Sequence, residues 1–535
     1  MSTTNAVIPQ WDRFEELWTS DVTYPNPLHD ARLRVTFTAP SGTSRTVDGF
    51  WDGETTWRVR FSPSVPGRWQ WRTNCSDKSN AGLHDRAGSF TCGDADGATR
   101  FGQHGPVRLS ANRRYLAHAD GTPFLWMADT VWAGPLRSTA EEWLLYLDER
   151  VRQGFTAAQW VTTQFVGAPD GDVLREFAYT GESRIAVNPN FFRRLDARID
   201  AINHAGLLAV PVLLWAAEWS PPGVNAVNPG FALPEGEAIR LARYMIARWD
   251  AHHVAWILPG DGDYRGEKAE KWRRIGRALF AGEDAASHAP VILHPAGMQM
   301  PQEEFRDEEW LSVAGYQSGH GDDARTLRWM VTGPPATEWQ QPPLRPFINL
   351  EPPYENHLAY QSKRPFDAHA VRRALYWSLL NAPTAGVTYG GHGVWGWDDG
   401  SSPPANHPST GIPLPWREAL RMHAAEQVAH VTGLFSAVDW WTLHPEPDLL
   451  AMQPGDADPA RHVLLSRSAA GDLLVAYTPV EQTISLHIDR VDPDLRMVWF
   501  DPRAGSRQFA AQRVNLETRD YDPPGAGDWV LLGER

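Results

Sequence analysis

Cysteine, long apolar segments and clustered positive charge are all scarce in this chain of 535 residues. Its only cysteines are Cys75 and Cys92, which excludes a disulfide framework and cannot complete a zinc site made of cysteines. No apolar run approaches the length of about 18 residues that a membrane span needs. The N-terminal residues also lack the basic and apolar regions of a secretion signal, so we expect a cytoplasmic protein that does not contact membranes.

Acidic residues outnumber basic ones, 65 against 50, which gives a formal net charge of −15. The lysines and arginines are scattered along the chain and form no basic run. Nucleic acids and anionic membrane surfaces are therefore poor candidates for the main partner, because both are bound through concentrated positive charge. We expect a partner that is neutral or small.

Tryptophan, in contrast, is abundant, with 26 residues against 20 phenylalanines and 13 tyrosines. Its broad apolar ring carries one N–H donor, which suits packing in a core and also stacking on the C–H faces of sugars. We expect most of the tryptophans to be core residues and a minority to face a ligand.

Both ends of the chain have the pattern of β-sandwich domains. Residues 1–96 contain short segments that alternate apolar and polar residues, separated by turn signals such as Asp52-Gly53 and Pro66-Gly67. Residues 431–535 show the same pattern. A stretch rich in glycine and aspartate follows the first sandwich, and we interpret residues 97–114 as a linker.

Residues 115–430 alternate apolar, strand-like segments with helical periods, and eight such units can be counted. One helix has the spacing of a capping box at Ser138 and Glu141, and the fifth unit ends in a short acidic helix near Glu303. Eight units predict a closed barrel. The alternative is a doubly wound sheet, but no glycine-rich phosphate loop follows the first strand. The predicted fold class is α/β, a (β/α)8 TIM barrel flanked by N-terminal and C-terminal β-sandwich domains.

Two carboxylates stand at the ends of predicted barrel strands. Asp261 ends the fourth strand and Glu351 ends the seventh, so the ring places them across its mouth from each other. Two carboxylates that flank the scissile bond are the catalytic groups of most glycoside hydrolases. Each residue alone also has an ordinary explanation, a turn carboxylate for Asp261 and a structural ion pair for Glu351.

Six motifs in barrel order give the chain a resemblance to a known family. They lie after strands one, four, five, six, seven and eight: Ala128-Asp129-Thr130-Val131-Trp132, Trp256 to Asp261, His294-Pro295-Ala296-Gly297, Gln317-Ser318-Gly319-His320, Glu351-Pro352-Pro353-Tyr354-Glu355 and Tyr389-Gly390-Gly391-His392-Gly393-Val394-Trp395. With these motifs, residues of about 7 to 430 resemble the apiosidase-like glycoside hydrolases, grouped as glycoside hydrolase family 140 and its relatives.

The resemblance implies a retaining double displacement, with Asp261 as general acid/base and Glu351 as nucleophile. It also implies a carbohydrate substrate, in this case a small glycoside or oligosaccharide whose glycone is a pentose or furanose. Long loops after the second, third and eighth strands predict a closed pocket and therefore exo action. Other polar and aromatic residues at the strand ends are candidates for substrate binding: Asp129, Trp132, Trp215, His294, Gln317, His320, Tyr354, His392, Trp395 and Trp397.

Three of these candidates are histidines, so a metal site is an alternative interpretation of the same residues. The spacing of His294, His320 and His392 fits no His-x-x-x-His pair, and we expect hydroxyl-binding donors with no metal and no cofactor. An inverting hydrolase or a transglycosidase that uses the same two carboxylates remains open, as does a barrel that binds carbohydrate without catalysis. The sequence also leaves open the sugar, its anomer, and whether the β domains support a homo-oligomer.

Overall fold

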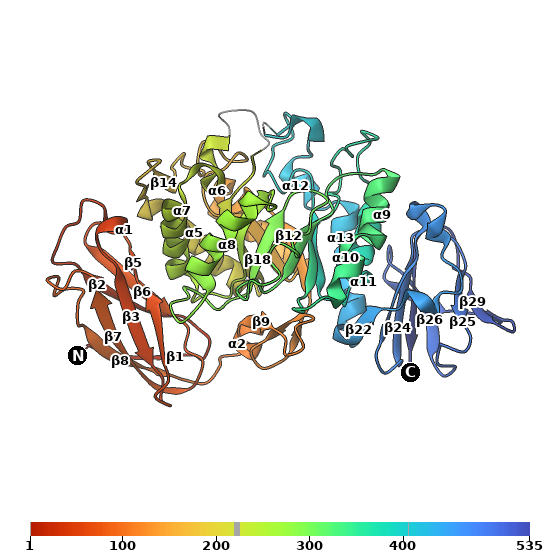
Figure 1. Cartoon of the computed structure of the whole chain (residues 1–535), viewed down its shortest axis with the longest axis horizontal. Coiled ribbons are helices and arrows are strands. Elements are labelled where there is room, and N and C mark those ends of the chain that lie inside the picture. The colour runs from red at the N-terminus through yellow and green to blue at the C-terminus, as the bar shows by residue number, and fades with distance from the viewer. Residues whose placement is uncertain (1, 219–224, 405) are drawn as a thin grey trace.

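The computed structural model describes residues 2–218, 225–404 and 406–535. Three regions follow one another along the longest axis of the molecule: an N-terminal β domain, a central α/β barrel and a C-terminal β domain (Figure 1). Among the described residues, no helix combines the length and apolarity that a membrane crossing requires.

The N-terminal domain consists of two sheets that pack face to face. Their strand orders are β1-β8-β7-β3-β4 and β2-β6-β5. Phe14 stacks on Phe90 and Phe37 stacks on Phe61, both with ring centroids 4.1 Å apart, and each pair joins the two sheets. The strands are β1 (Ser2–Ile8), β2 (Phe14–Thr19), β3 (Leu33–Thr38), β4 (Ser44–Asp48), β5 (Phe50–Trp51), β6 (Thr56–Phe61), β7 (Gly67–Cys75) and β8 (Ala87–Cys92), with the short helix α1 (Pro27–Asp30) between β2 and β3.

The segment interpreted from sequence as a linker contains regular structure. Helix α2 (Arg100–His104) and strand β9 (Val107–Leu109) both lie within residues 97–114. Strand β9 pairs with β10 (Leu116–His118), which pairs with β11 (Pro123–Phe124), and this small sheet lies beneath the barrel in Figure 1. The segment thus connects the two domains in sequence and also forms part of this small sheet.

Eight parallel strands form the central barrel, as predicted. Their order is β18-β17-β16-β13-β12-β21-β20-β19, and a parallel bridge between Ile292 and Val313 closes the ring from β18 to β19. Seven of the strands are wholly buried, and only Asp261 of β17 is partly exposed. The strands are β12 (Trp126–Thr130), β13 (Ala157–Val161), β16 (Leu208–Trp215), β17 (Trp256–Gly262), β18 (Val291–Pro295), β19 (Ala314–Gln317), β20 (Phe347–Glu351) and β21 (Gly386–Gly390).

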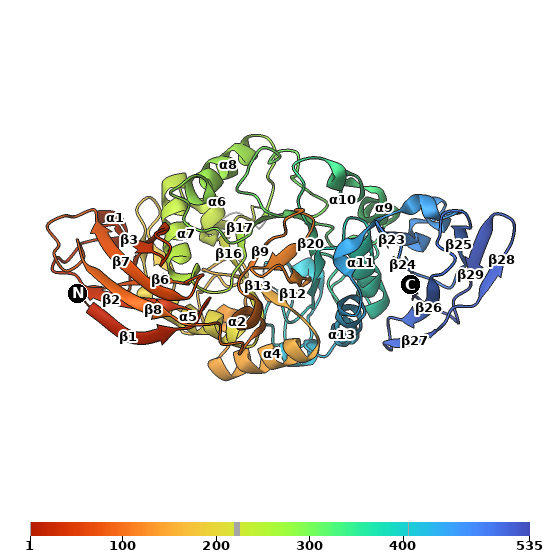
Figure 2. The same cartoon turned by 90° about the horizontal axis from the view of Figure 1, so that it is seen from below.

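Helices surround the barrel (Figure 2). The main ones are α4 (Ala140–Arg152), α5 (Pro189–His204), α7 (Glu235–Trp249), α8 (Glu267–Phe280), α9 (Ala324–Thr332), α11 (Ala368–Leu380) and α13 (His423–Ser436). Two local predictions were wrong. The capping box of α4 uses Thr139 and Glu142 instead of Ser138 and Glu141, because Thr139 accepts the N–H of Glu142 while its own N–H donates to that glutamate. Residues 301–307, near Glu303, form turns instead of a short helix.

The C-terminal domain also has two sheets, of order β22-β23-β24-β30-β26-β27 and β25-β29-β28. Helix α13 runs past the predicted boundary at residue 430, and the first strand of the domain begins at Leu443. The buried ion pair between Arg372 of α11 and Asp528 fastens the domain to the barrel. The strands are β22 (Leu443–Pro445), β23 (Leu464–Ser468), β24 (Leu473–Thr478), β25 (Ile484–His487), β26 (Arg496–Asp501), β27 (Ser506–Phe509), β28 (Gln512–Val514), β29 (Thr518–Tyr521) and β30 (Trp529–Glu534).

A buried carboxylate joins the N-terminal domain to the barrel. Asp196 of α5 accepts hydrogen bonds from Arg60 of β6 (2.8 Å) and from Arg248 of α7 (2.6 Å). Burial by itself would raise the pKa of Asp196, but the two guanidinium groups hold it well below its ordinary value. Asp196 is therefore ionised in the folded protein at neutral pH, and its ion pairs link the two domains.

Replacement of Asp196 by Asn should lower the free energy of unfolding by about 3 kcal/mol at pH 7, because it removes the negative charge that two buried guanidinium groups share and leaves Arg60 only Glu15 and Arg248 only Asp52. A carboxylate whose pKa is depressed by folding stabilises the protein above its unfolded pKa of about 4 and loses that effect as the pH falls. Denaturant titrations from pH 7 to pH 3 should therefore show the gap between the two proteins narrowing below about pH 4.

The matched control is Asp284→Asn. Asp284 pairs with Arg34 across the same two domains, but 74% of its side chain is exposed. Exposed pairs contribute at most about 1 kcal/mol, so this variant should unfold almost like the parent protein. Equal losses from both substitutions would contradict the role assigned to Asp196.

Candidate active site

Glu351 is a buried carboxylate with several polar partners at the carboxyl ends of the barrel strands. It is the last residue of β20 and is 8% exposed. Its Oε1 accepts hydrogen bonds from Gln317 Nε2 and His320 Nε2, both at 2.9 Å. His294 Nε2 lies 3.4 Å from Oε2. Strands β18, β19 and β20 are consecutive in the ring, and the parallel arrangement brings these side chains to one edge.

These partners decide the charge of Glu351. Burial alone would raise its pKa, but the hydrogen bonds and charges of His294 and His320 outweigh burial and hold the pKa well below its ordinary value. The carboxylate is thus ionised at neutral pH. Tyr316 precedes Gln317 on β19 but faces the other way, packing against Trp329, so it does not contribute a donor.

Asp261 stands in a strained backbone position at the end of β17. Its φ angle is +51°, in the left-handed region that aspartate tolerates better than most residues. The residues on either side, Gly260 and Gly262, are glycines because neither position has room for a side chain. A Cβ at Gly260 would lie 2.6 Å from the Trp215 ring, and one at Gly262 would lie 2.4 Å from the Tyr264 ring. The two glycines therefore let aromatic rings pack on both sides of the carboxylate.

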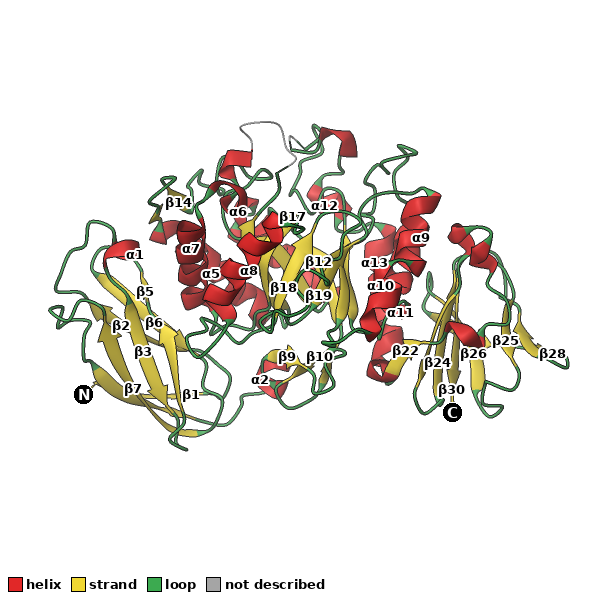
Figure 3. Cartoon of the chain, viewed as in Figure 1, coloured by secondary structure: helices red, strands yellow, loops and turns green. Residues whose placement is uncertain are grey.

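Asp261 and Glu351 line the same cavity. Its volume is about 320 Å³, and its lining residues lie at the carboxyl ends of the barrel strands and on the loops that follow them. Figure 3 shows these loops above the barrel strands. Both carboxylates also affect the Tyr354 hydroxyl. Burial and the charges of Glu351 and Asp261 raise the pKa of Tyr354 well above its ordinary value. The lining residues are Trp132, Phe165, Trp215, Asp261, Ala296, Gly297, Gln317, Gly319, His320, Glu351, Tyr354, His357, Tyr360, Trp395, Asn406, His407 and Thr410.

Aromatic rings form one wall of the cavity. Trp215 meets Trp132 edge to face at 5.2 Å and Phe165 at 5.3 Å. The indole N–H groups of Trp215 and Trp395 are buried and have no hydrogen-bond partner among the described residues. This combination of apolar faces and unpaired donors suits a ligand that presents both C–H surfaces and hydroxyl groups.

Of the residues predicted to bind substrate, six lie on the cavity wall: Trp132, Trp215, Gln317, His320, Tyr354 and Trp395. His294 lies behind Glu351, and its ring packs edge to face on Trp132. His392 is fully buried, and its Nε2 lies 3.2 Å from the Thr410 hydroxyl, so it supports a wall residue. Neither histidine reaches the cavity surface.

Two further predictions fail on geometry. Asp129 is fully buried and points into the helix layer, where it accepts hydrogen bonds from Arg150 Nε (2.7 Å) and the Tyr146 hydroxyl (2.8 Å). It cannot bind sugar hydroxyls from there. Trp397 stacks on Trp416 with ring centroids 4.1 Å apart and is also part of the core.

Several wall residues escaped the sequence analysis because they lie on loops instead of strand ends. His357 stacks on His320 at 4.1 Å, and Tyr360 meets the same ring edge to face. Phe165 comes from the loop after β13, and Asn406, His407 and Thr410 come from the loop after β21. The sequence predicted long loops after β13 and β21, but not the loop residues that line the cavity.

The described residues contain no group of three or more His, Cys, Asp or Glu side chains arranged to hold a metal ion. His320 Nε2 instead contacts Oε1 of Glu351 at 2.9 Å, and His294 Nε2 lies 3.4 Å from Oε2. These two histidines therefore stabilise the ionised form of Glu351.

Family models match all three regions of the chain. Residues 110–442, more than half of the sequence, match the family described as apiosidase-like, catalytic domain. Residues 7–76 match a domain of unknown function, and residues 445–534 match a model described as a collagen-binding domain of a collagenase. A search of curated proteins gave no match.

Solved structures share the architecture. A protein from Bacteroides vulgatus described as a glycoside hydrolase superposes with a TM-score of 0.74 at 20% identity, covering 98% of this chain and 99% of its own. A second protein, described only as a glycoside hydrolase, gives a TM-score of 0.69 at 19% identity and covers 81% of this chain and 97% of its own. At these identities the structures support the fold alone. From the family match over its barrel, the chain belongs to the apiosidase-like family of glycoside hydrolases.

Proposed function

We propose that this protein is a retaining exo-glycosidase in which Glu351 is the nucleophile and Asp261 the general acid/base. The observation that carries the proposal is the buried, ionised carboxylate of Glu351, which shares one small cavity with Asp261. A pair of carboxylates on a common cavity is the arrangement that glycoside hydrolysis requires.

Glu351 is suited to attack an anomeric carbon. The donors Gln317 and His320 fix one of its oxygens, while Oε2 keeps the longer contact to His294. In the first step a bond forms between a Glu351 oxygen and the anomeric carbon as the glycosidic bond breaks. The donors hold the carboxylate in a defined position, so little reorganisation is needed before attack.

Asp261 is suited to exchange protons. It is partly exposed, whereas Glu351 is buried, so its carboxyl group can reach both the cavity and water at the mouth. In the first step its proton passes to the leaving oxygen. In the second it takes a proton from the water that releases the sugar from Glu351, and both residues return to their starting states.

The size of the cavity supports cleavage of a small terminal glycone. A volume of about 320 Å³ is near the lower limit of about 300 Å³ for small-molecule sites. Residues from the loops after β20 and β21 form part of its wall, which favours a pocket over an open groove. A pentose or furanose glycone, released from a small glycoside or oligosaccharide, fits this space.

The stereochemistry of the product tests the mechanism. Aryl furanosides and pyranosides should be screened, and hydrolysis of the active substrate followed by proton NMR from the first turnover. A retaining enzyme releases the anomer present in the substrate. First appearance of the opposite anomer would replace the proposal with inversion by the same residues, and a carboxyl separation of about 6.5 to 9.5 Å would agree with that outcome. Failure to cleave any furanoside or pyranoside would favour a binding barrel.

Asp261→Ala should slow the hydrolysis of substrates with poor leaving groups far more than those with good ones, because only poor leaving groups need a proton. We expect a loss of about 10³-fold for an alkyl glycoside, within the usual range for general acid catalysis, and a much smaller loss in the first step for a dinitrophenyl glycoside. Steady-state kinetics over a series of leaving groups measures both. Equal losses across the series would contradict the acid role of Asp261.

A further inference from the structure

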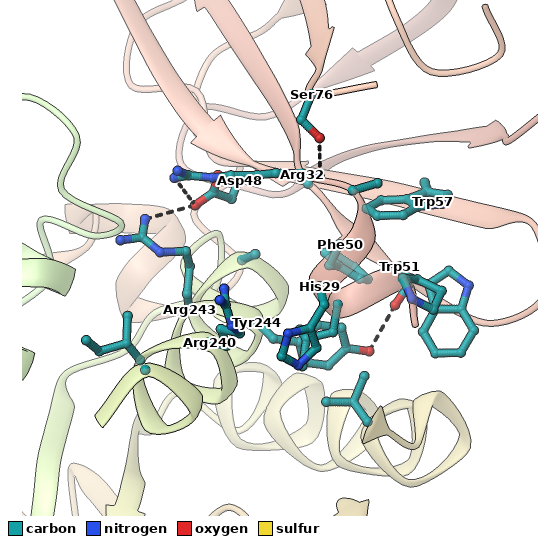
Figure 4. Close-up of a pocket in the computed structure, with 18 residues that line it drawn as sticks. His29, Arg32, Asp48, Phe50, Trp51, Trp57, Ser76, Arg240, Arg243 and Tyr244 are labelled. Carbon is teal, nitrogen blue, oxygen red and sulfur yellow. Dashed lines mark hydrogen bonds and ion pairs between the residues drawn. The ribbon is translucent and has the colours of Figure 1, made fainter. Parts of the chain in front are cut away.

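A second cavity, distinct from the catalytic one, lies between the N-terminal β domain and helix α7. Its volume is about 490 Å³. The β domain contributes residues from α1, β4, β5 and β6, and the barrel contributes one face of α7 (Figure 4). None of the residues that line it belongs to the catalytic cavity.

Positive charge dominates the polar lining of this cavity. Arg32, Arg240 and Arg243 line it, and Asp48 is the one acidic residue among the lining residues. Asp48 is already shared: Arg32 holds both of its oxygens, at 2.8 and 3.1 Å, and Arg243 Nη1 lies 3.2 Å from Oδ2. Figure 4 shows the two arginines reaching this carboxylate from opposite domains. Since one carboxylate cannot neutralise two guanidinium groups, positive charge remains.

Arg240 adds to this surplus. About half of its side chain is exposed, and its Nε donates a long hydrogen bond of 3.4 Å to Glu237. Glu237 is engaged elsewhere, because it accepts the N–H of Ile185 and lies 3.1 Å from His29 Nε2. The terminal nitrogens of Arg240 have no hydrogen-bond partner among the described residues, and their geometry matches a carboxylate.

The rest of the lining is apolar and aromatic. Phe50, Trp51 and Trp57 come from the β domain, and Ile239 and Tyr244 come from α7. The His29 side chain, 6% exposed, also lines the cavity, and its Nε2 faces Glu237. The cavity therefore offers apolar surface and the terminal nitrogens of Arg240 in a chain whose net charge is −15.

We propose that this cavity is a binding site for a saccharide that carries a carboxylate, with Arg240 as the principal partner of the acid group. The apolar and aromatic wall would contact the C–H surface of the sugar. The guanidinium groups would bind a sugar that carries a carboxylate more tightly than the same sugar without one. The site would hold an acidic part of a larger carbohydrate, or a separate one, away from the catalytic centre.

The glycine at position 236 allows a direct test. It lies in the first turn of α7 on the wall of the cavity, and a Cβ placed there meets no atom within 4 Å. Gly236→Trp would therefore place a large ring at the wall of the cavity without a clash near the backbone, and Gly236→Ala would add only a methyl group there. The probes are methyl glucuronide and methyl glucoside, titrated against the full chain by calorimetry or NMR, so that no turnover is needed.

We expect the glucuronide to bind at least about tenfold more tightly than the glucoside, as a charge-assisted hydrogen bond predicts. Gly236→Trp should abolish this binding, Gly236→Ala should retain it, and Arg240→Ala should reduce the glucuronide to the level of the glucoside. Arg513→Ala, at an exposed arginine of the C-terminal domain, is the control that should change nothing. Equal affinities for the two probes, or unchanged binding in Gly236→Trp, would overturn the proposal. Because binding alone is measured, neither result depends on Asp261 or Glu351.

Discussion

Glu351→Ala is expected to lower kcat by about 10⁴-fold or more, the size of loss that removal of a covalent nucleophile causes. The substitution removes the carboxylate but leaves Gln317, His320 and His294 in place. The fold should persist, because Glu351 lies at a strand end beside a cavity, and the strands β18, β19 and β20 that its partners come from are also joined by backbone pairing. Circular dichroism and thermal unfolding of the variant should therefore resemble those of the parent protein.

Rescue by a small anion separates a nucleophile from a residue that merely binds. The space left by the carboxylate keeps its donors, so azide can enter and attack the anomeric carbon of an aryl glycoside with a good leaving group. The expected product is a glycosyl azide of the opposite anomeric configuration, detected by NMR or mass spectrometry. Rescue that returns the sugar with its original configuration would contradict the role of Glu351.

Glu355→Gln is the matched control. This carboxyl group lies four positions further along, is 5% exposed and accepts hydrogen bonds from the Tyr389 hydroxyl and from backbone N–H groups at the start of α13. Burial raises the pKa of this carboxyl group, and glutamine keeps its size and one acceptor oxygen. Turnover should stay within about tenfold of the parent value. If Glu355→Gln lowered kcat as much as Glu351→Ala does, the effect of the Glu351 substitution on kcat would not be specific to that residue.

The barrel and the two carboxylates were predictable because they depend on local pattern and on ring topology. Apolar segments of strand length, each followed by a helical period, specify parallel strands, and parallel strands in a ring have their carboxyl ends at one mouth. Any residue that ends a strand is then near that mouth. Asp261 and Glu351 both end barrel strands, and both line the cavity.

The loop residues were not predictable in the same way. His357 and His407 reach the cavity because the loops after β20 and β21 fold back over the mouth. Such a path depends on contacts formed only in the folded chain, such as the stacking of His357 on His320. Burial lowers the pKa of both His357 and His407, which favours their neutral forms.

Asp129 shows where the strand-end rule fails. Successive side chains of a barrel strand point alternately to the interior and to the helices. Thr130 points inward and accepts a hydrogen bond from Gln159, whose amide also reaches the Leu350 carbonyl. Asp129, one position earlier, must then point outward. The alternation was available in the sequence, but the register could not be assigned without knowing which residue of the strand faces the interior.

Replacement of Arg150 by Met should lower the free energy of unfolding by about 3 to 5 kcal/mol, because it leaves the Asp129 carboxylate buried without its counter-charge. Both side chains are 0% exposed. Arg150 also donates to Gln153 and to the Leu420 carbonyl, so its loss unpairs further acceptors. Denaturant unfolding measures the effect. Arg152→Met on the same helix is the control, since its side chain is 54% exposed and its ion pairs should contribute less than about 1 kcal/mol.

Asp129→Asn completes the argument, because it separates a structural role from substrate binding. Asparagine keeps the shape and one acceptor for Tyr146 and Arg150, so the protein should fold with reduced stability. If Asp129 acts only within the helix layer, KM and kcat below the unfolding transition should match those of the parent enzyme. A raised KM in a fully folded variant would return Asp129 to the list of residues that bind the sugar, and would mean that the cavity changes shape when substrate enters.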